Sequence, residues 1–124
     1  MTKSKKIKAY RLGHYAEYLA VIVLSIKGYA IKERRYRSPL GEIDIIAKKG
    51  RTTIFCEVKA RKDYVTAVES LSEKQRQRIS RSAEYYMSHL KMNNANNKIE
   101  NEIYRCDMIL VMPWRWPVHI KNAW

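Results

Sequence analysis

Two strand-like runs, residues 42–48 and 52–59, lie on either side of a short segment centred on Gly50 and predict a β-hairpin. Glycine at the first position of a two-residue loop favours a type II′ turn, whose twist matches that of the paired strands. Because this turn fixes which residues face each other, it predicts that Asp44 lies opposite Glu57. The same register decides which side chains share each face of the hairpin.

Side chains of a strand alternate between two faces, and in this register one face of the hairpin is wholly apolar. That face comprises Ile43 with Val58, Ile45 with Cys56, and Ala47 with Ile54. The other face comprises Glu42 with Lys59, Asp44 with Glu57, and Ile46 with Phe55. The acidic pair therefore lies on a face that mixes charged and apolar side chains.

The pair of Asp44 and Glu57 predicts a divalent-metal site. Like charges directly opposed on neighbouring strands destabilise a sheet unless a positive charge lies between them. Mg²⁺ is held by one or two carboxylates, completed by water and substrate phosphate oxygens, so two acids supply what such a site needs. Lys59 lies two positions from Glu57 on the same face, where its ammonium could orient an attacking water or stabilise charge developing on a phosphate.

A simpler interpretation is that this face is only the solvated side of an amphipathic hairpin, with Glu42 paired to Lys59 and screened by water. Against it, Ile46 and Phe55 share the face, which places the carboxylates at the rim of a covered surface. An uncompensated charge is hard to tolerate there. The sequence pattern alone leaves both interpretations open.

Apolar periodicity and turn residues predict the remaining elements. A stripe of apolar residues spaced three and four apart predicts a helix over residues 10–27 that ends at Gly28, and a second helix is expected after the capping box Ser70-Leu71-Ser72-Glu73. Further strands are expected over residues 29–37, 108–112 and 118–121, the last at a sheet edge. Residues 1–124 are expected to form a single domain, with residues 1–9 a basic flexible tail and residues 91–103 an exposed Asn-rich loop.

The charge balance favours a polyanionic partner. Lysine and arginine number 25 against 12 aspartate and glutamate residues, so the net charge is +13 and the pI about 9.9. Nucleic acid is the first partner class to expect, and an anionic membrane is its rival. We expect no membrane association, because the apolar run over residues 19–24 is too short to span a bilayer and no cleavage site follows it. A cytoplasmic location is the default expectation, with Cys56 and Cys106 as reduced core thiols.

Four short motifs resemble those of the YraN-like bacterial proteins, which belong to the PD-(D/E)XK nuclease superfamily. They are Gly13-x-x-x-Glu17, Gly41-Glu42-Ile43-Asp44, Glu57-Val58-Lys59-x-Arg61 and Arg105-x-Asp107. The ordered set is far more specific than Glu-x-Lys alone, which recurs by chance. The resemblance implies an α/β fold with a restriction-endonuclease-like αβββαβ core, in which a mixed central sheet is flanked by two main helices and carries an extra C-terminal edge strand.

The resemblance also implies roles for individual residues. Asp44, Glu57 and the backbone carbonyl of Val58 would bind Mg²⁺ or Mn²⁺, and Glu17 would approach the metal from the first helix. Lys59 would be the catalytic lysine. Gln75, which follows Lys74, resembles a Lys/Gln position in the Holliday-junction resolvases of this superfamily, which implies a catalytic role. No small-molecule cofactor is implied.

Basic and aromatic residues indicate how nucleic acid would be held. We expect phosphate contacts from residues that cluster near the first turn, after the hairpin and on the second helix: Arg34, Arg35, Arg37, Arg61, Lys74, Arg76 and Arg78. The segment Trp114-Arg115-Trp116 could stack on unpaired bases, but we favour the alternative that it plugs one end of the core.

Two functions follow from these observations. The first is a divalent-metal-dependent nuclease that hydrolyses phosphodiester bonds in DNA, with branched or distorted DNA as the expected substrate and a homodimer left open. The second is a noncatalytic nucleic-acid-binding module that keeps the nuclease fold.

Overall fold

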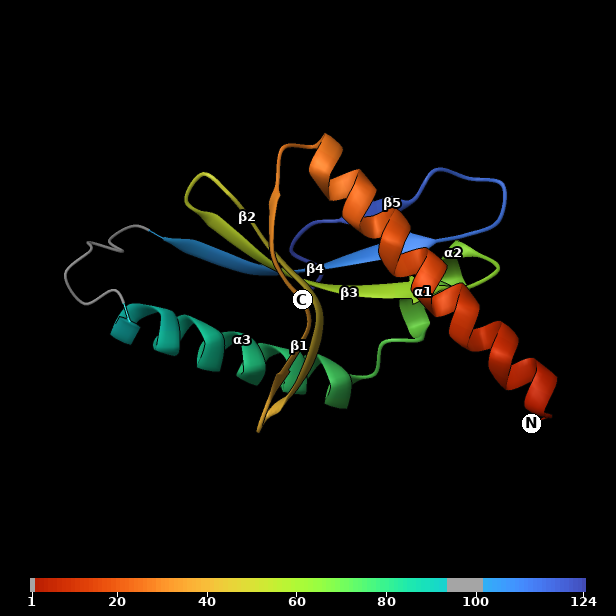
Figure 1. Cartoon of the computed structure of the whole chain (residues 1–124), viewed down its shortest axis with the longest axis horizontal. Coiled ribbons are helices and arrows are strands. Elements are labelled where there is room, and N and C mark those ends of the chain that lie inside the picture. The colour runs from red at the N-terminus through yellow and green to blue at the C-terminus, as the bar shows by residue number, and fades with distance from the viewer. Residues whose placement is uncertain (1, 94–101) are drawn as a thin grey trace.

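The computed structural model describes residues 2–93 and 102–124 of the chain and has mixed α/β architecture (Figure 1). The predicted fold class is confirmed, because a mixed sheet is flanked by helices in a manner consistent with a restriction-endonuclease-like fold. The elements are, in order, α1 (Lys3–Ile26), β1 (Ala30–Ser38), β2 (Gly41–Lys49), β3 (Thr52–Ala60), α2 (Tyr64–Glu69), α3 (Glu73–Asn93), β4 (Ile103–Val111) and β5 (Val118–Ile120).

The sheet has five strands in the order β1-β2-β3-β4-β5. The first three strands are antiparallel neighbours, β4 is parallel to β3, and β5 is antiparallel to β4. The parallel pair is joined through α2 and α3, as parallel strands require a long crossover. As a result, the C-terminal ends of β3 and β4 meet at the same end of the sheet.

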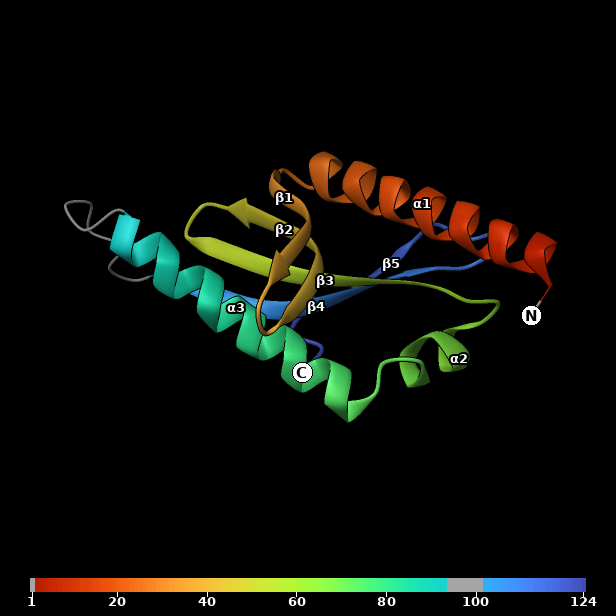
Figure 2. The same ribbon diagram turned by 60° about the horizontal axis from the view of Figure 1, so that its bottom comes forward.

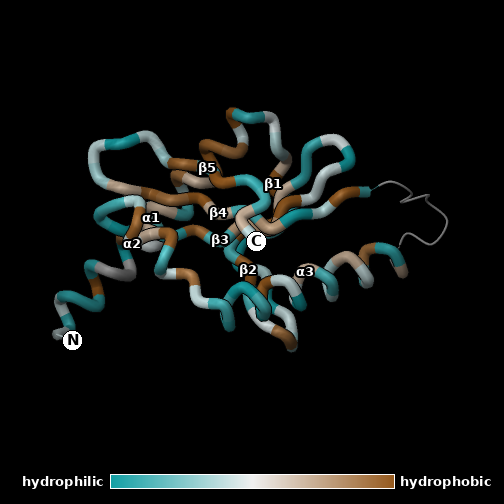
Figure 3. The backbone as a smooth tube through the Cα atoms, turned by 180° about the vertical axis from the view of Figure 1, so that it is seen from behind, coloured by the Kyte–Doolittle hydropathy of each residue, from teal (hydrophilic) through white to brown (hydrophobic). Residues whose placement is uncertain are grey.

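Helices cover both faces of the sheet, with α1 on one side and α2 and α3 on the other (Figure 2). The hydrophobic segments gather in the strands, while α3 alternates along its length (Figure 3). On the α1 side, Ala20 and Leu24 pack against Ile45, Cys56 and Ile109. The core on the α3 side contains Ile79, Ala83 and Met87 with Ile46, Phe55 and Met108 from the strands.

The β2–β3 hairpin has the predicted register over its outer half. Ile45 pairs with Cys56 and Ala47 with Ile54, and Gly50 has a positive φ of 61° at the turn. The ladder ends at Ile45, so the predicted pairs beyond it are absent from the register. Ile43, expected beside Ile45, packs instead in the α3-side core, so the alternation of side chains between the two faces is broken between Ile43 and Ile45, where the ladder stops.

Helix α1 begins earlier than the apolar stripe predicts. The expected flexible tail over residues 1–9 is wrong for the part described, since residues 3–9 are helical behind the N-cap Thr2, whose side chain accepts from the Lys5 amide. Lysine and alanine favour helix without any apolar stripe. The predicted end is confirmed: Gly28 has φ of 94°, and the Tyr29 amide bonds to the Leu24 carbonyl in a Schellman arrangement. Among the described residues, no helix has the length and apolar composition to cross a membrane.

The segment before α3 contains a helix that the sequence pattern did not predict. Residues 61–69, expected to be irregular, include α2, which begins at the N-cap Asp63. The capping box of α3 lies two residues later than predicted: the Ser72 hydroxyl accepts from the Gln75 amide, and the Gln75 side chain accepts from the Ser72 amide. Ser70 instead ends α2. The expected Asn-rich loop over residues 91–103 is wrong at its two ends, because α3 continues to Asn93 and β4 starts at Ile103. Residues 94–101 of that prediction lie outside the described residues.

The C-terminal strands confirm one prediction and overturn another. Residues 106–112 are all buried, as expected for a strand covered on both faces, and β5 is an edge strand. The segment from Trp114 to Trp116 does not plug the core. Trp114 is 102% exposed and Trp116 65% exposed, so the core interpretation is wrong. The apolar character of these side chains predicted burial, but the β4–β5 connection carries them beyond the end of the sheet.

Candidate active site

Asp44 lies where β2 and β3 separate. Its Oδ2 accepts a hydrogen bond from the Val58 backbone amide at 2.9 Å. The last paired position of the two strands is Ile45 with Cys56, so the carboxylate satisfies an amide that β2 no longer reaches. The side chain of Asp44 is thereby fixed next to Glu57. The two acids meet as the sequence predicted, although a side-chain hydrogen bond rather than a continued ladder brings them together.

The two carboxyl groups interact directly and are both largely shielded from water. Burial raises the pKa of Asp44, although the Val58 amide opposes that shift. Burial and the adjacent negative charge of Asp44 raise the pKa of Glu57 to about 8. Burial and their mutual repulsion therefore disfavour two full negative charges on this pair.

Lys59 completes this cluster. Its Nζ lies 3.6 Å from Glu57 Oε1, and the two side chains are only 12% and 14% exposed. The solvated-face interpretation is therefore wrong, since Glu42 pairs with the exposed Arg37 and not with Lys59. A lysine and two acids gathered out of bulk water make a strongly polar centre inside a covered surface.

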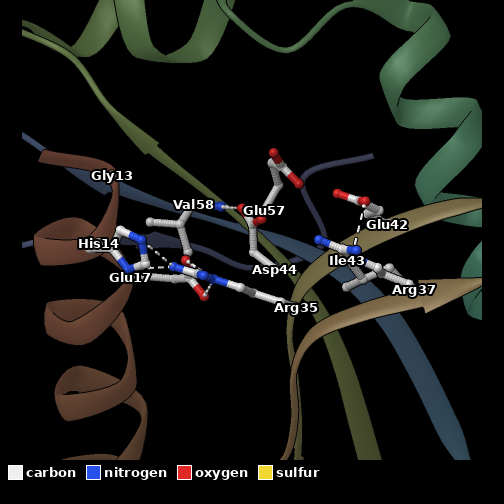
Figure 4. Close-up of a pocket in the computed structure, with 10 residues that line it drawn as sticks. All are labelled: Gly13, His14, Glu17, Arg35, Arg37, Glu42, Ile43, Asp44, Glu57 and Val58. Carbon is white, nitrogen blue, oxygen red and sulfur yellow. Dashed lines mark hydrogen bonds and ion pairs between the residues drawn. The ribbon is translucent and has the colours of Figure 1, made fainter. Parts of the chain in front are cut away.

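Glu17 reaches the same place from α1. It is buried, with a side chain 10% exposed, and both of its oxygens accept from Arg35 Nε at 3.3 and 3.2 Å. Arg35 Nη2 also contacts the imidazole of His14, which lies one helical turn before Glu17. Figure 4 shows the Arg35 side chain crossing from β1 towards these two residues, beside Asp44. Arg35 has φ of 54°, an uncommon conformation for a residue with a side chain.

These residues line a cleft of about 380 Å³ between α1 and the β1–β2 hairpin. It is lined by Gly13, His14, Glu17, Arg35, Arg37, Glu42, Ile43, Asp44, Glu57 and Val58. A second cleft of about 320 Å³ lies on the α3 side and is also lined by Asp44 and Glu57, together with Gln75 and Arg78. The acidic pair thus separates two openings, one beneath each layer of helices.

The part of the chain that matches a known protein family includes the acidic residues and Lys59 of this site. Residues 16–111 match the model described as "Uncharacterised protein family UPF0102", a span that includes Glu17, Asp44, Glu57 and Lys59. The chain belongs to the UPF0102 family. A UPF0102 protein of Mesorhizobium japonicum is 42% identical over 94% of this chain and 88% of its own length. The UPF0102 protein of Sinorhizobium medicae is 41% identical over 95% of this chain and 92% of its own length. That of Maricaulis maris is 36% identical over 100% of this chain and 92% of its own length.

The predicted nucleic-acid contacts of this UPF0102 chain divide into two groups. Arg35 and Arg37 line the first cleft, Arg78 lines the second, and Arg61 lies beside Lys59 at the end of β3. The other three do not gather there. Arg34 and Lys74 are exposed without lining either cleft, and Arg76 lies in a groove with Trp124 and Ser80.

Gln75 lies at the second cleft but has a structural partner. Its Oε1 accepts a hydrogen bond from the Ser72 backbone amide as part of the capping box at the N-terminus of α3. The predicted catalytic role would have to use the amide nitrogen of the same side chain.

The donor set fits Mg²⁺ better than a metal that needs a complete protein cage. Within residues 2–93 and 102–124, no three His, Cys, Asp or Glu side chains are grouped as a metal site by themselves. Mg²⁺ does not require this, because it keeps several waters and uses one or two carboxylates. Burial and, after it, the charge of Asp44 raise the pKa of Glu57, and a bound divalent cation would favour the charged form of both acids.

Two polar groups of this UPF0102 chain had no role in the sequence prediction. His14 contacts Arg35 in the first cleft, and its position three residues before Glu17 was the signal that could have identified it. Asp107, from the Arg-x-Asp motif, lies away from both clefts. It is fully buried and accepts from Arg105, from His119 at 2.7 Å and from the Asn122 amide, which holds the C-terminal segment against β4. Cys56 and Cys106 are free buried thiols, as expected.

Proposed function

We propose that this UPF0102 protein is a divalent-metal-dependent nuclease that hydrolyses phosphodiester bonds in DNA. The observation that carries the proposal is the cluster of Asp44, Glu57 and Lys59 at the point where β2 and β3 separate. Two largely buried acids in contact with each other are costly to keep, so a role that uses both charges explains their presence better than stability does.

Each residue of the cluster has a part in this proposal. Asp44 and Glu57 would hold Mg²⁺ or Mn²⁺ with the Val58 carbonyl, and Glu17 would approach from α1. When bound, the metal would neutralise charge on the phosphate and favour ionisation of a water molecule. Lys59, held 3.6 Å from Glu57, would orient the attacking water or stabilise negative charge that develops on the phosphate. The Asp44–Val58 hydrogen bond would keep the carboxylate from turning away.

The arrangement of cations supports a polyanionic substrate. Arg35 and Arg37 border one side of the acidic pair and Arg78 the other, so a phosphate at the acids has positive charge on both sides. The net charge of +13 adds long-range attraction. We propose branched or distorted DNA as the substrate, with a cytoplasmic location. Resolution of a symmetric branch needs two cuts and therefore two copies of the site, so a homodimer belongs to this proposal.

Cleavage assays test the proposal directly. Purified protein would be incubated with duplex, single-stranded and four-way-junction DNA in Mg²⁺ or Mn²⁺, alongside Asp44→Ala, Glu57→Ala and Lys59→Ala. We expect each substitution to reduce cleavage at least about 100-fold, while Glu84→Ala, an exposed acid on α3, has no effect. Cleavage that survives all three substitutions would come from elsewhere and would refute the proposal.

The second candidate is a noncatalytic nucleic-acid-binding module, and the Arg35–Glu17 ion pair favours it. That pair satisfies one of the acids with a guanidinium and without a metal. A protein that binds DNA with a steep salt dependence, never cuts it and takes up no metal in calorimetry would establish this alternative.

A further inference from the structure

The connection between β4 and β5 displays two tryptophans that are largely exposed to solvent. Trp114 is 102% exposed and Trp116 65% exposed, with the exposed Arg115 between them. Trp124 shows the contrast, because it is partly buried and its indole Nε1 donates to the Ser80 hydroxyl at 3.0 Å. Large apolar side chains displayed in this way mark a binding surface more often than a packing element.

The loop that carries the two tryptophans is firmly held. Leu110 pairs with Val118 across its base, and both Met112 and Pro117 are buried. Trp114 has φ of 61°, in the left-handed region that residues with a side chain seldom adopt. The side chains are thus presented on a fixed frame, which lowers the entropy cost of binding a ligand on them.

The loop lies at the same end of the sheet as the candidate active site. Lys59 is level with Leu110, and Leu110 is level with Val118, so the base of the loop is two strand spacings, about 10 Å, from Lys59. The end of β3 is joined to the end of β4 by a hydrogen bond from the Arg61 amide to the Val111 carbonyl. Arg61, Lys62 and Arg115 are exposed at this end of the sheet.

We propose that Trp114 and Trp116 form a stacking platform for unpaired bases of a nucleic-acid strand that passes from the active-site cleft across the ends of β3 and β4. This deepens the proposed function and rests on it for the position of the scissile phosphate. It assigns the substrate class: DNA with a single-stranded segment beside the cut. Indole rings stack on any base face, and the guanidinium between them provides a contact for the phosphate backbone.

Charge and position select this occupant. Exposed cations between the two tryptophans and at the neighbouring end of β3 match a polyanion, and a duplex would keep its base faces stacked out of reach. The surface is also separate from the family match, which ends at residue 111, before the loop begins. An anionic bilayer is the competing occupant, since tryptophan and arginine also suit a membrane interface.

Binding measurements without metal test the platform independently of catalysis. Fluorescence anisotropy would follow a labelled 20-nucleotide oligo-dT and a duplex of matched length in EDTA, with wild type, Trp114→Ala, Trp116→Ala, the double variant and Trp114→Phe. We expect each alanine substitution to weaken oligo-dT binding about tenfold, the phenylalanine to retain most of the affinity, and duplex binding to change less than twofold. Ile26→Ala, another exposed apolar residue, is the matched control and should change neither.

Three results would overturn the inference. One is oligo-dT binding by the double variant within twofold of wild type, and another is an equal loss for oligo-dT and duplex. The third is that the two tryptophans are needed for binding to vesicles of phosphatidylglycerol and phosphatidylcholine and not for oligo-dT. Because both side chains are exposed, the variants should unfold at the wild-type temperature, which circular dichroism would check.

The same variants separate this inference from the proposed function. If oligo-dT binding depends on the tryptophans but no DNA is cut, the nuclease proposal fails and the platform stands. If DNA is cut in a manner that depends on Asp44, and the double variant binds and cuts forked DNA as wild type does, the platform fails and the nuclease proposal stands.

Discussion

The carboxylate of Asp44 accepts a hydrogen bond from the Val58 backbone amide just beyond the last paired position of β2 and β3, which is Ile45 with Cys56. This contact bridges the two strands where their ladder has ended, and it holds Asp44 next to Glu57. A continued ladder would have joined the strands there with backbone hydrogen bonds. The fold therefore gives up regular β2–β3 pairing beyond Ile45 and Cys56, and the buried acidic pair lies there.

Glu57→Gln should stabilise the metal-free protein. The substitution keeps the shape of the side chain and removes a carboxylate that burial and Asp44 disfavour, with a pKa raised to about 8. A raised acid pKa means that the folded state binds its proton more tightly than the unfolded state, so Glu57 destabilises the fold increasingly as pH rises above about 4.3 towards 8.

We expect Glu57→Gln to raise the free energy of unfolding by about 1 kcal/mol at pH 8 in EDTA, measured by urea denaturation. The gain should shrink towards pH 4, where the wild-type acid is protonated in both states. Glu42→Gln, on an exposed acid, is the control and should have no such effect. A loss of stability at pH 8 would show that the charge of Glu57 is well compensated in the free protein.

Arg35→Ala should tighten metal binding while it weakens DNA binding. Arg35 donates to both oxygens of Glu17 and adds a positive charge beside the acidic pair, so it competes with a cation for the same acids. We expect Mn²⁺ affinity to increase about fivefold and DNA affinity at low salt to fall, because one phosphate contact is lost. Calorimetry with Mn²⁺ and anisotropy with DNA measure the two effects, with Arg34→Ala as the neighbouring control. Unchanged or weaker Mn²⁺ binding would mean that Glu17 takes no part in holding the metal.

Asp107→Asn should lower the stability of the fold and make that stability depend less on pH under acid conditions. Burial alone would raise the pKa of Asp107, but hydrogen bonds from His119, Arg105 and the Asn122 amide outweigh it and lower the pKa below its ordinary value. Its contribution to stability is therefore complete above the unfolded pKa of about 3.9 and is lost as pH falls through the lower folded value.

We expect Asp107→Asn to cost about 3 kcal/mol at pH 7, since it leaves buried partners of a charged group uncompensated. Thermal unfolding between pH 2 and pH 7 would show wild type losing stability below about pH 4 more steeply than the variant. If the two proteins lost thermal stability equally as the pH falls below about 4, another carboxylate would govern the acid response.

The sequence predicted the parts of this molecule that depend on strong local rules. A glycine at the turn predicted the β2–β3 register near Gly50, and apolar spacing predicted the buried face of α1 from Ala16 to Leu24. The hairpin pattern also predicted that Asp44, Glu57 and Lys59 lie close together, and the approach of Glu17 was implied only by the family resemblance. Local rules failed at Ile43, which packs on the opposite face of the sheet from Ile45.

The other differences have their own physical reasons. The first turns of α1 carry helix-favouring lysines but no apolar stripe, and α2 is too short to show a period. The Trp114 loop was misjudged because large apolar residues are more often buried than displayed. His14 was missed because its partner, Arg35, is distant in the sequence and reaches it only through the fold.

A calorimetric titration of Mn²⁺ into the protein at pH 7.5 tests most directly whether Asp44 and Glu57 hold a divalent cation. Wild type would be compared with Asp44→Asn and Glu57→Gln. Asparagine can still accept the Val58 hydrogen bond, so Asp44→Asn should keep the fold while it removes one of the two charges. We expect wild type to bind Mn²⁺ saturably and each variant to bind it at least about tenfold more weakly. Mn²⁺ should raise the unfolding temperature of wild type alone. Equal Mn²⁺ affinity in all three proteins would contradict the claim that these two acids hold a divalent cation.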